Sequence, residues 1–180
     1  MPKILYIHNK IDARAERANL TQVLSMCAAF SSQGFNVTLA VPSYQGMTEE
    51  QAHFFAKNEL GVNIDFQISI APRPRIAKRI DKMFPALWLK QELLNQEWDF
   101  CYLRSPTILG TCLKSGVPVV YESHNATQHQ GSRWLNRFFQ MRVVSFSKQS
   151  NFLMLVAISH ALRLFWTKRG VCKKKDVGCS

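Results

Sequence analysis

The 180-residue chain carries 23 Lys and Arg against 12 Asp and Glu, a formal net charge of +11, and 47% of its residues are hydrophobic. This is the composition of an ordinary globular protein that is long enough for one sizeable core. No apolar run reaches the roughly 18 residues that a membrane-spanning helix needs, and the first residues predict a strand instead of a signal peptide.

Strands and helices are predicted to alternate along the whole chain. Gly34 stands where a helix C-cap glycine belongs, and Thr48 with Gln51 forms a capping-box type of helix start. The predicted strands cover residues 4–8, 36–41, 65–70, 99–103, 117–121 and 152–158. The predicted helices cover residues 14–33, 48–60, 76–95 with an interruption or restart at Pro85, 105–115, 132–150 and 159–170. The alternation predicts an α/β fold, a doubly wound, Rossmann-like parallel sheet over residues 1–171. Residues 172–180 are expected to be a basic tail.

The strand at residues 117–121 leads into a polar tip. Its valines and Tyr121 are typical of a strand that is buried on both faces. Glu122, His124 and Asn125 are expected just past its carboxyl end, which is the edge where open α/β sheets bind ligands. We therefore expect the functional site here. The alternative is that His124 only satisfies a backbone group of the loop.

Positive charge is concentrated in the second part of the chain. Residues 1–72 hold 5 basic and 6 acidic residues, whereas residues 73–180 hold 18 and 6. Such an asymmetry indicates an anionic partner or, alternatively, a basic face that only meets solvent. Two segments place basic residues beside Trp, Phe and Leu, one from Arg73 to Lys82 and the other from Arg133 to Arg142. The expected members of a membrane or anion patch are Arg73, Arg75, Lys78, Arg79, Arg133 and Arg137.

Basic residues next to aromatic ones on a helix suit a membrane surface that bears anionic lipid. The alternative is that the aromatic residues pack in the core and the arginines face solvent. Nucleic acid is not an expected partner, because the chain has no nucleic-acid-binding motif and its aromatic residues have helical spacing.

Several common site motifs are missing from the sequence. No Gly-x-Gly-x-x-Gly, P-loop or Gly-x-Ser-x-Gly motif is present, and residues 1–33 contain no glycine. A dinucleotide-binding dehydrogenase, a P-loop NTPase and an α/β-hydrolase are therefore not expected. The five cysteines lack the close-pair spacing of metal ligands, and three lie in apolar segments as expected core residues. These features predict a reduced, cytoplasmic protein.

The segments at the strand ends, taken together in order, resemble the N-terminal domain of family-4-type retaining glycosyltransferases, which have the GT-B fold. The segments are Tyr6–Asn9, Glu16–Asn19, Met26–Phe30, Gly34–Leu39, Asp99–Pro106, Tyr121–His124 and Val156–Ser159. The resemblance covers residues 3–171. It implies one half of a two-domain enzyme, in which this half binds the sugar acceptor and the other half holds a nucleotide-sugar donor.

The resemblance also implies roles for individual residues. It places His124 at the reaction centre with Glu122 orienting the loop. Arg104 would bind phosphate or orient the tip, unless it only forms an ion pair with Glu122. The implied substrate-binding residues are Asn9, Arg17, Arg104, Asn125 and Ser159. Ser159 alternatively serves as a plain helix N-cap.

The donor half is not expected within this chain. No two glutamates stand eight positions apart, as they do in the family's donor motif, and no Asp-x-Asp pair is present to hold a divalent metal. We expect no metal or resident cofactor. We also expect little sugar transfer without a C-terminal donor domain or a separate donor subunit. Residues 172–180 would form the start of the connection to such a donor domain.

The acceptor would be a glycan or a lipid-linked sugar of cell-envelope polysaccharide synthesis. The protein would then lie in the cytoplasm or peripherally on the inner face of the membrane. The alternative is a non-enzymatic basic module that binds a membrane or a protein partner.

Overall fold

The computed structural model describes residues 1–8, 17–42, 48–59, 61, 63–72, 84–124 and 133–171. These ranges contain six strands and six helices. The strands are β1 (Lys3–Ile7), β2 (Asn36–Val41), β3 (Gln67–Ile70), β4 (Phe100–Leu103), β5 (Val119–Ser123) and β6 (Phe152–Ala157). The helices are α1 (Arg17–Ser32), α2 (Glu49–Glu59), α3 (Phe84–Asn95), α4 (Pro106–Lys114), α5 (Arg133–Phe146) and α6 (His160–Thr167).

The strands form one parallel sheet in the order β3-β2-β1-β4-β5-β6. The first three strands follow one another outward from β1 to β3, and β4 to β6 continue the sheet on the other side of β1. This is the Rossmann-like strand order. The predicted α/β fold with a doubly wound parallel sheet is therefore confirmed. The chain divides into two compact units, residues 1–101 and 102–180, and each is described by itself.

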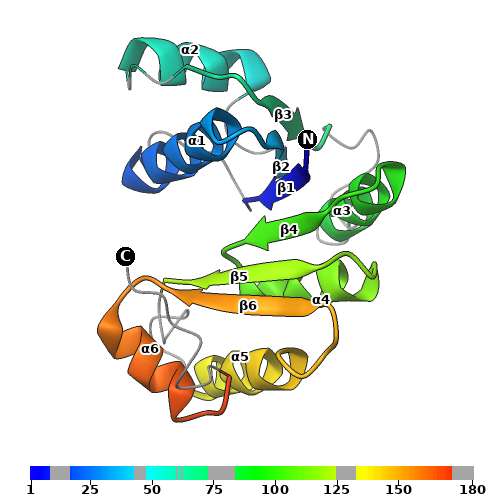
Figure 1. The fold of residues 1–180 in the computed structure, drawn as a ribbon, viewed down its shortest axis with the longest axis vertical. Coiled ribbons are helices and arrows are strands. Elements are labelled where there is room, and N and C mark those ends of the chain that lie inside the picture. Colours follow the sequence, from blue (N-terminus) through cyan, green and yellow to red (C-terminus); the bar gives the residue numbers. More distant parts are fainter. Residues whose placement is uncertain are drawn as a thin grey trace. The chain divides into compact units, whose positions relative to one another are not determined.

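The first unit is built on the predicted β-α-β arrangement. Strand β1 pairs in parallel with β2, and β2 pairs in parallel with β3 (Figure 1). The side chains of Ile4, Leu5, Tyr6 and Ile7 are fully buried, so β1 is covered on both faces. Gly34 ends α1 with a φ of 86°, a conformation that glycine adopts without steric cost.

The start of α2 confirms the predicted capping box. The Thr48 N–H donates to Gln51 Oε1 at 3.0 Å, and the Gln51 N–H donates to Thr48 Oγ1 at 3.3 Å. Each side chain thus satisfies a backbone donor that the first helical turn leaves without a partner.

In the second unit, β5 and β6 run side by side, with α4 and α5 against each other (Figure 1). The close approach of the two helices depends on Gly110. A Cβ atom at this position would lie 3.0 Å from Phe146 Cζ and 3.2 Å from Arg142 Nη2. The small residue therefore lets α5 pack directly on α4.

Two local predictions are corrected by the structure. Strand β5 covers Val119–Ser123 instead of residues 117–121, because Pro118 has no N–H for the ladder and Glu122 and Ser123 pair with Val156 and Ala157 of β6. Glu122 thus lies within the strand and not past its end. Ser105 precedes α4 as expected, but its hydroxyl meets Thr107 Oγ1 at 2.7 Å and forms no cap hydrogen bond with the backbone.

The described helices include none that is long and apolar enough to cross a membrane. Cys27, Cys101 and Cys112 are buried free thiols, which confirms the expectation that three cysteines are core residues.

Candidate functional site

A cluster of three polar side chains lies at the carboxyl ends of β4 and β5. Arg104 directly follows β4, Glu122 is the last residue but one of β5, and His124 directly follows β5. Because β4 and β5 are neighbouring parallel strands, their carboxyl ends share one edge of the sheet. Arg104 is 20 positions from His124 in the sequence, and the sheet brings it beside Glu122 and His124.

Hydrogen bonds join the three side chains. Arg104 Nε lies 2.7 Å from His124 Nε2, and Arg104 Nη2 lies 2.8 Å from His124 Nδ1. His124 Nε2 also contacts Glu122 Oε1. Arg104 Nε is 3.9 Å from the same carboxylate oxygen, so the arginine and the glutamate form an ion pair. Both alternatives for Arg104, orienting the tip and pairing with Glu122, therefore hold in one arrangement.

The contacts select a tautomer of the imidazole. With the proton on Nε2, His124 donates to Glu122 and accepts at Nδ1 from Arg104 Nη2, so two of the three contacts are satisfied. With the proton on Nδ1, only the contact from Arg104 Nε to His124 Nε2 is satisfied. We therefore assign the neutral, Nε2-protonated form.

The surroundings favour a neutral imidazole. Burial lowers the pKa of His124 below its ordinary value of 6.5, the negative charge of Glu122 opposes this change, and the positive charge of Arg104 adds to it. The His124 side chain is 21% exposed, whereas those of Arg104 and Glu122 are 10% and 5% exposed. His124 is thus the member of the cluster that a ligand meets first, and the other two support it from within.

The second carboxylate oxygen of Glu122 takes no part in the hydrogen bonds of the cluster. Its Oε2 atom is buried and has no hydrogen-bond partner among the described residues. Buried carboxylate oxygens are nearly always paired. This atom is therefore an exception within the cluster, a buried acceptor with no partner among the described residues.

A hydrogen bond between Ser123 and α6 fixes the tip of β5. Successive strand residues point to opposite faces, so the Ser123 side chain points away from that of Glu122. Its Oγ accepts a hydrogen bond of 2.9 Å from Trp166 Nε1, and both side chains are buried. Strand β5 is thereby held between the site on one face and α6 on the other.

Of the remaining predicted substrate-binding residues, Ser159 has a structural role. Its hydroxyl accepts a hydrogen bond from the Leu162 N–H at 3.3 Å, which makes it the N-cap of α6. This is the alternative that the sequence left open. Arg17 lies in α1, but its side chain is outside the described residues. Asn9 and Asn125 are outside them altogether, so their roles stay predictions.

The predicted basic patch is described only in part. Arg137 lies on the exposed side of α5, and Arg133 begins that helix with a side chain outside the described residues. Four further members lie outside the described residues, namely Arg73, Arg75, Lys78 and Arg79.

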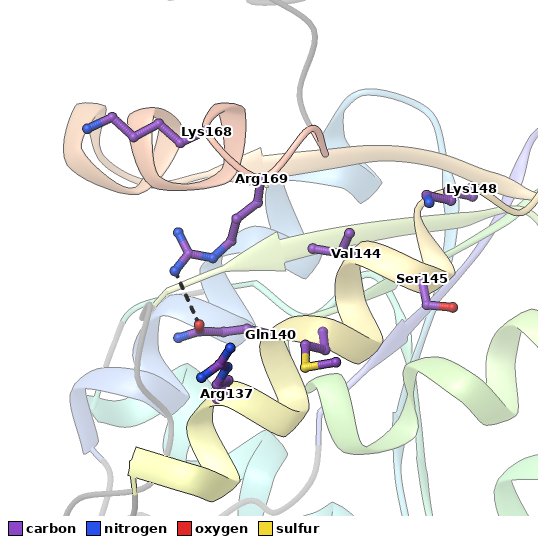
Figure 2. A pocket seen from close by; sticks show the side chains of 8 residues that line it. Arg137, Gln140, Val144, Ser145, Lys148, Lys168 and Arg169 are labelled. Carbon is purple, nitrogen blue, oxygen red and sulfur yellow. Dashed lines mark hydrogen bonds between the residues drawn. The ribbon is translucent and has the colours of Figure 1, made fainter.

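An open groove that the sequence did not predict lies between α5 and the end of α6 (Figure 2). Its volume is about 660 Å³, and its lining side chains are Arg137, Gln140, Met141, Val144, Ser145, Lys148, Lys168 and Arg169. Lys168 and Arg169 are separated from the α5 residues in the sequence. The strong basic bias of residues 73–180 was the one signal that pointed toward such a site.

No group of three or more His, Cys, Asp and Glu side chains suited to a metal ion occurs within the described ranges.

Comparisons with known proteins give a distant likeness of fold. No family model and no curated protein matches the chain. Among solved structures, the C-terminal domain of a hydrogenase from Pyrococcus furiosus matches with a TM-score of 0.43 and 15% identity, over 67% of this chain and 89% of that domain. UGT2 from Phytolacca americana, complexed with UDP-2-fluoroglucose and pterostilbene, matches with a TM-score of 0.47 and 11% identity. That match covers 93% of this chain but 35% of the other chain. Neither likeness is close enough to carry a function.

Proposed function

We propose that this chain is the acceptor-binding half of a retaining glycosyltransferase, and that its acceptor is a glycan or a lipid-linked sugar. The observation that carries the proposal is the Arg104–Glu122–His124 cluster. It presents a partly exposed, neutral imidazole, backed by a buried ion pair, at the sheet edge where α/β proteins bind ligands. The order of the strand-end segments, which resembles that of family-4-type enzymes, supports the same function.

The chemistry of the cluster suits a sugar hydroxyl. A hydroxyl both donates and accepts, and a neutral imidazole can match it in either sense near neutral pH. Both ring nitrogens of His124 already have partners. A sugar hydroxyl therefore takes the place of Arg104 Nη2 as the hydrogen-bond donor to His124 Nδ1. Arg104 keeps its ion pair with Glu122. His124 is the proposed catalytic residue that touches the acceptor, and Glu122 positions it.

The donor is assigned to a second domain or a separate subunit. The sequence has no pair of glutamates at the spacing of the family's donor motif. A nucleotide sugar is then a substrate of the complete enzyme, and this half binds and orients the acceptor.

The proposal is tested on an array of neutral and anionic mono- and oligosaccharides. The wild-type chain is expected to bind a subset of them, and His124→Ala is expected to weaken that binding roughly tenfold, because the sugar hydroxyl loses its hydrogen bond to Nδ1. Glu122→Gln should weaken it as well, because it removes the ion pair with Arg104 and leaves only an uncharged acceptor to hold the imidazole N–H. The matched control is His160→Ala, which removes an exposed imidazole at the start of α6 and should leave binding unchanged.

Two results would contradict the proposed function. One is that no saccharide binds to the wild-type chain. The other is that His124→Ala binds the same saccharides as strongly as the His160→Ala control does.

A further inference from the structure

Helix α5 presents an apolar ridge on its exposed face. Trp134 is 72% exposed, Phe138 is 44% exposed and Met141 is 64% exposed. At 3.6 residues per turn these three side chains fall within an arc of roughly 60°. The rings of Trp134 and Phe138 stack with their centroids 5.9 Å apart, so the ridge is continuous along the helix. Large side chains in such a row mark an interaction surface rather than chance exposure.

A basic groove runs along one flank of this ridge. Arg137 of α5 lies about 40° from Met141 around the helix axis. Lys148 stands in the turn that follows α5 and lines the same groove. Lys168 and Arg169 add two more cations from the end of α6 (Figure 2). Met141 lines the groove as well as the ridge, so the two features form one surface.

The groove has an excess of positive charge that the described residues of the second unit do not neutralise. Residues 102–171 contain nine Lys and Arg but a single acidic residue, Glu122. That carboxylate is engaged with Arg104 and His124. Among the described residues, Arg169 has uncharged partners. Its guanidinium lies 3.5 Å from the centroid of the Phe165 ring and donates to the Phe165 carbonyl oxygen at 3.2 Å and to Gln140 Oε1 at 3.4 Å. The groove is therefore suited to an anion.

We propose that this surface binds an anionic membrane. Trp134, Phe138 and Met141 enter the headgroup region, and the groove between α5 and α6 takes the phosphate of an anionic phospholipid. An apolar ridge beside a basic groove favours a lipid surface as the partner. A free phosphate would bind the cations but would leave the apolar ridge exposed to water. The proposal rests on α5 and α6 and does not depend on the proposed sugar site.

The test measures co-sedimentation of the whole chain with vesicles of phosphatidylcholine, with and without phosphatidylglycerol. Binding is expected to the mixed vesicles only and to fall at high salt, because salt screens the attraction between charges. Lys148→Gln and Lys168→Gln should each weaken it about fivefold. The matched control is Lys114→Gln, which removes an exposed charge at the end of α4, outside the groove, and should change binding by less than twofold.

Tryptophan fluorescence is a second measurement, and it tests whether the apolar ridge inserts into the membrane. The fluorescence of Trp134 should shift to shorter wavelength when mixed vesicles are added, and the shift should be lost in Trp134→Ala although three other tryptophans remain. The changed residues are exposed, so each variant is expected to unfold at the wild-type temperature.

Four results would overturn the proposal. They are equal binding to vesicles without anionic lipid, equal weakening by Lys114→Gln and Lys148→Gln, unchanged Trp134 fluorescence on vesicles that do bind, and binding to single-stranded RNA but not to mixed vesicles. A failure here leaves the saccharide array unaffected, because no vesicles are present in that experiment.

Discussion

The hydrogen bond between Ser123 and Trp166 should hold β5 to α6, and Ser123→Ala tests it. The exposed fraction is 0% for Ser123 and 2% for Trp166, and the Nε1 to Oγ distance is 2.9 Å. Removing the hydroxyl leaves the indole N–H buried without an acceptor, and water cannot replace the serine at such a site. An unsatisfied buried donor costs about 1–3 kcal/mol.

This loss should be visible in both chemical and thermal unfolding. For a chain of this size each kcal/mol lowers the unfolding temperature by about 2–4 °C, so Ser123→Ala should lower it by roughly 2–12 °C. A suitable control is Ser145→Ala, the same chemical change on the exposed side of α5. The control should stay within about 0.5 kcal/mol of the wild type.

A double-mutant cycle separates the hydrogen bond from the packing of the ring. Trp166→Phe removes the donor and also leaves a cavity, so it should destabilise the protein more than Ser123→Ala. The two changes together should cost less than their sum by about 0.5–1.5 kcal/mol, the net value of one hydrogen bond. A coupling of zero, or a Ser123→Ala variant as stable as Ser145→Ala, would refute the reasoning.

Four further predictions concern titration, pH-dependent stability, packing and reactivity. Glu122→Gln should lower the pKa of His124 further in a histidine NMR titration, because the charge and hydrogen bond of Glu122 raise it, and a rise would contradict the site described above. Since the folded-state pKa of His124 lies below 6.5, the unfolded chain binds the proton first, so stability should fall as pH drops through about 6.5, and His124→Gln should reduce that fall. Gly110→Val should lower the free energy of unfolding in urea by about 1–3 kcal/mol through its clash with Phe146, and a variant as stable as the wild type would contradict this prediction. Cys27, whose thiol pKa is raised by burial, should resist alkylation at mildly alkaline pH until the protein is denatured, and rapid labelling seen by mass spectrometry would mean that α1 opens.

Local chemistry in the sequence was enough to predict most of the fold. The Thr48–Gln51 capping box, the C-cap at Gly34 and the alternation of strands with helices are all confirmed, because each depends on residues close together in the chain. The end of β5 was wrong by two residues. Its position depends on pairing with β6 and on the bond from Ser123 to Trp166, which are contacts between distant parts of the sequence.

The site could be predicted in its members but not in its hydrogen bonds. Parallel strands that end at one edge made it reasonable to group Arg104, Glu122 and His124. No pattern in the sequence shows that both imidazole nitrogens have protein partners, or that Arg104 binds both other residues. The groove was missed for a related reason, since Lys168 and Arg169 join Lys148 only when α6 has packed.

The central claim, that His124 meets a sugar acceptor, is tested most directly by histidine NMR during a saccharide titration. With labelled histidines, the ring signals of His124 should shift and reach saturation as a saccharide that the array retains is added, and the Nδ1 signal should change most because its Arg104 contact is exchanged for a hydroxyl. The signals of His160, an exposed imidazole on α6, should stay in place. A His124 spectrum that does not change with saccharide, or one that changes no more than that of His160, would contradict the account.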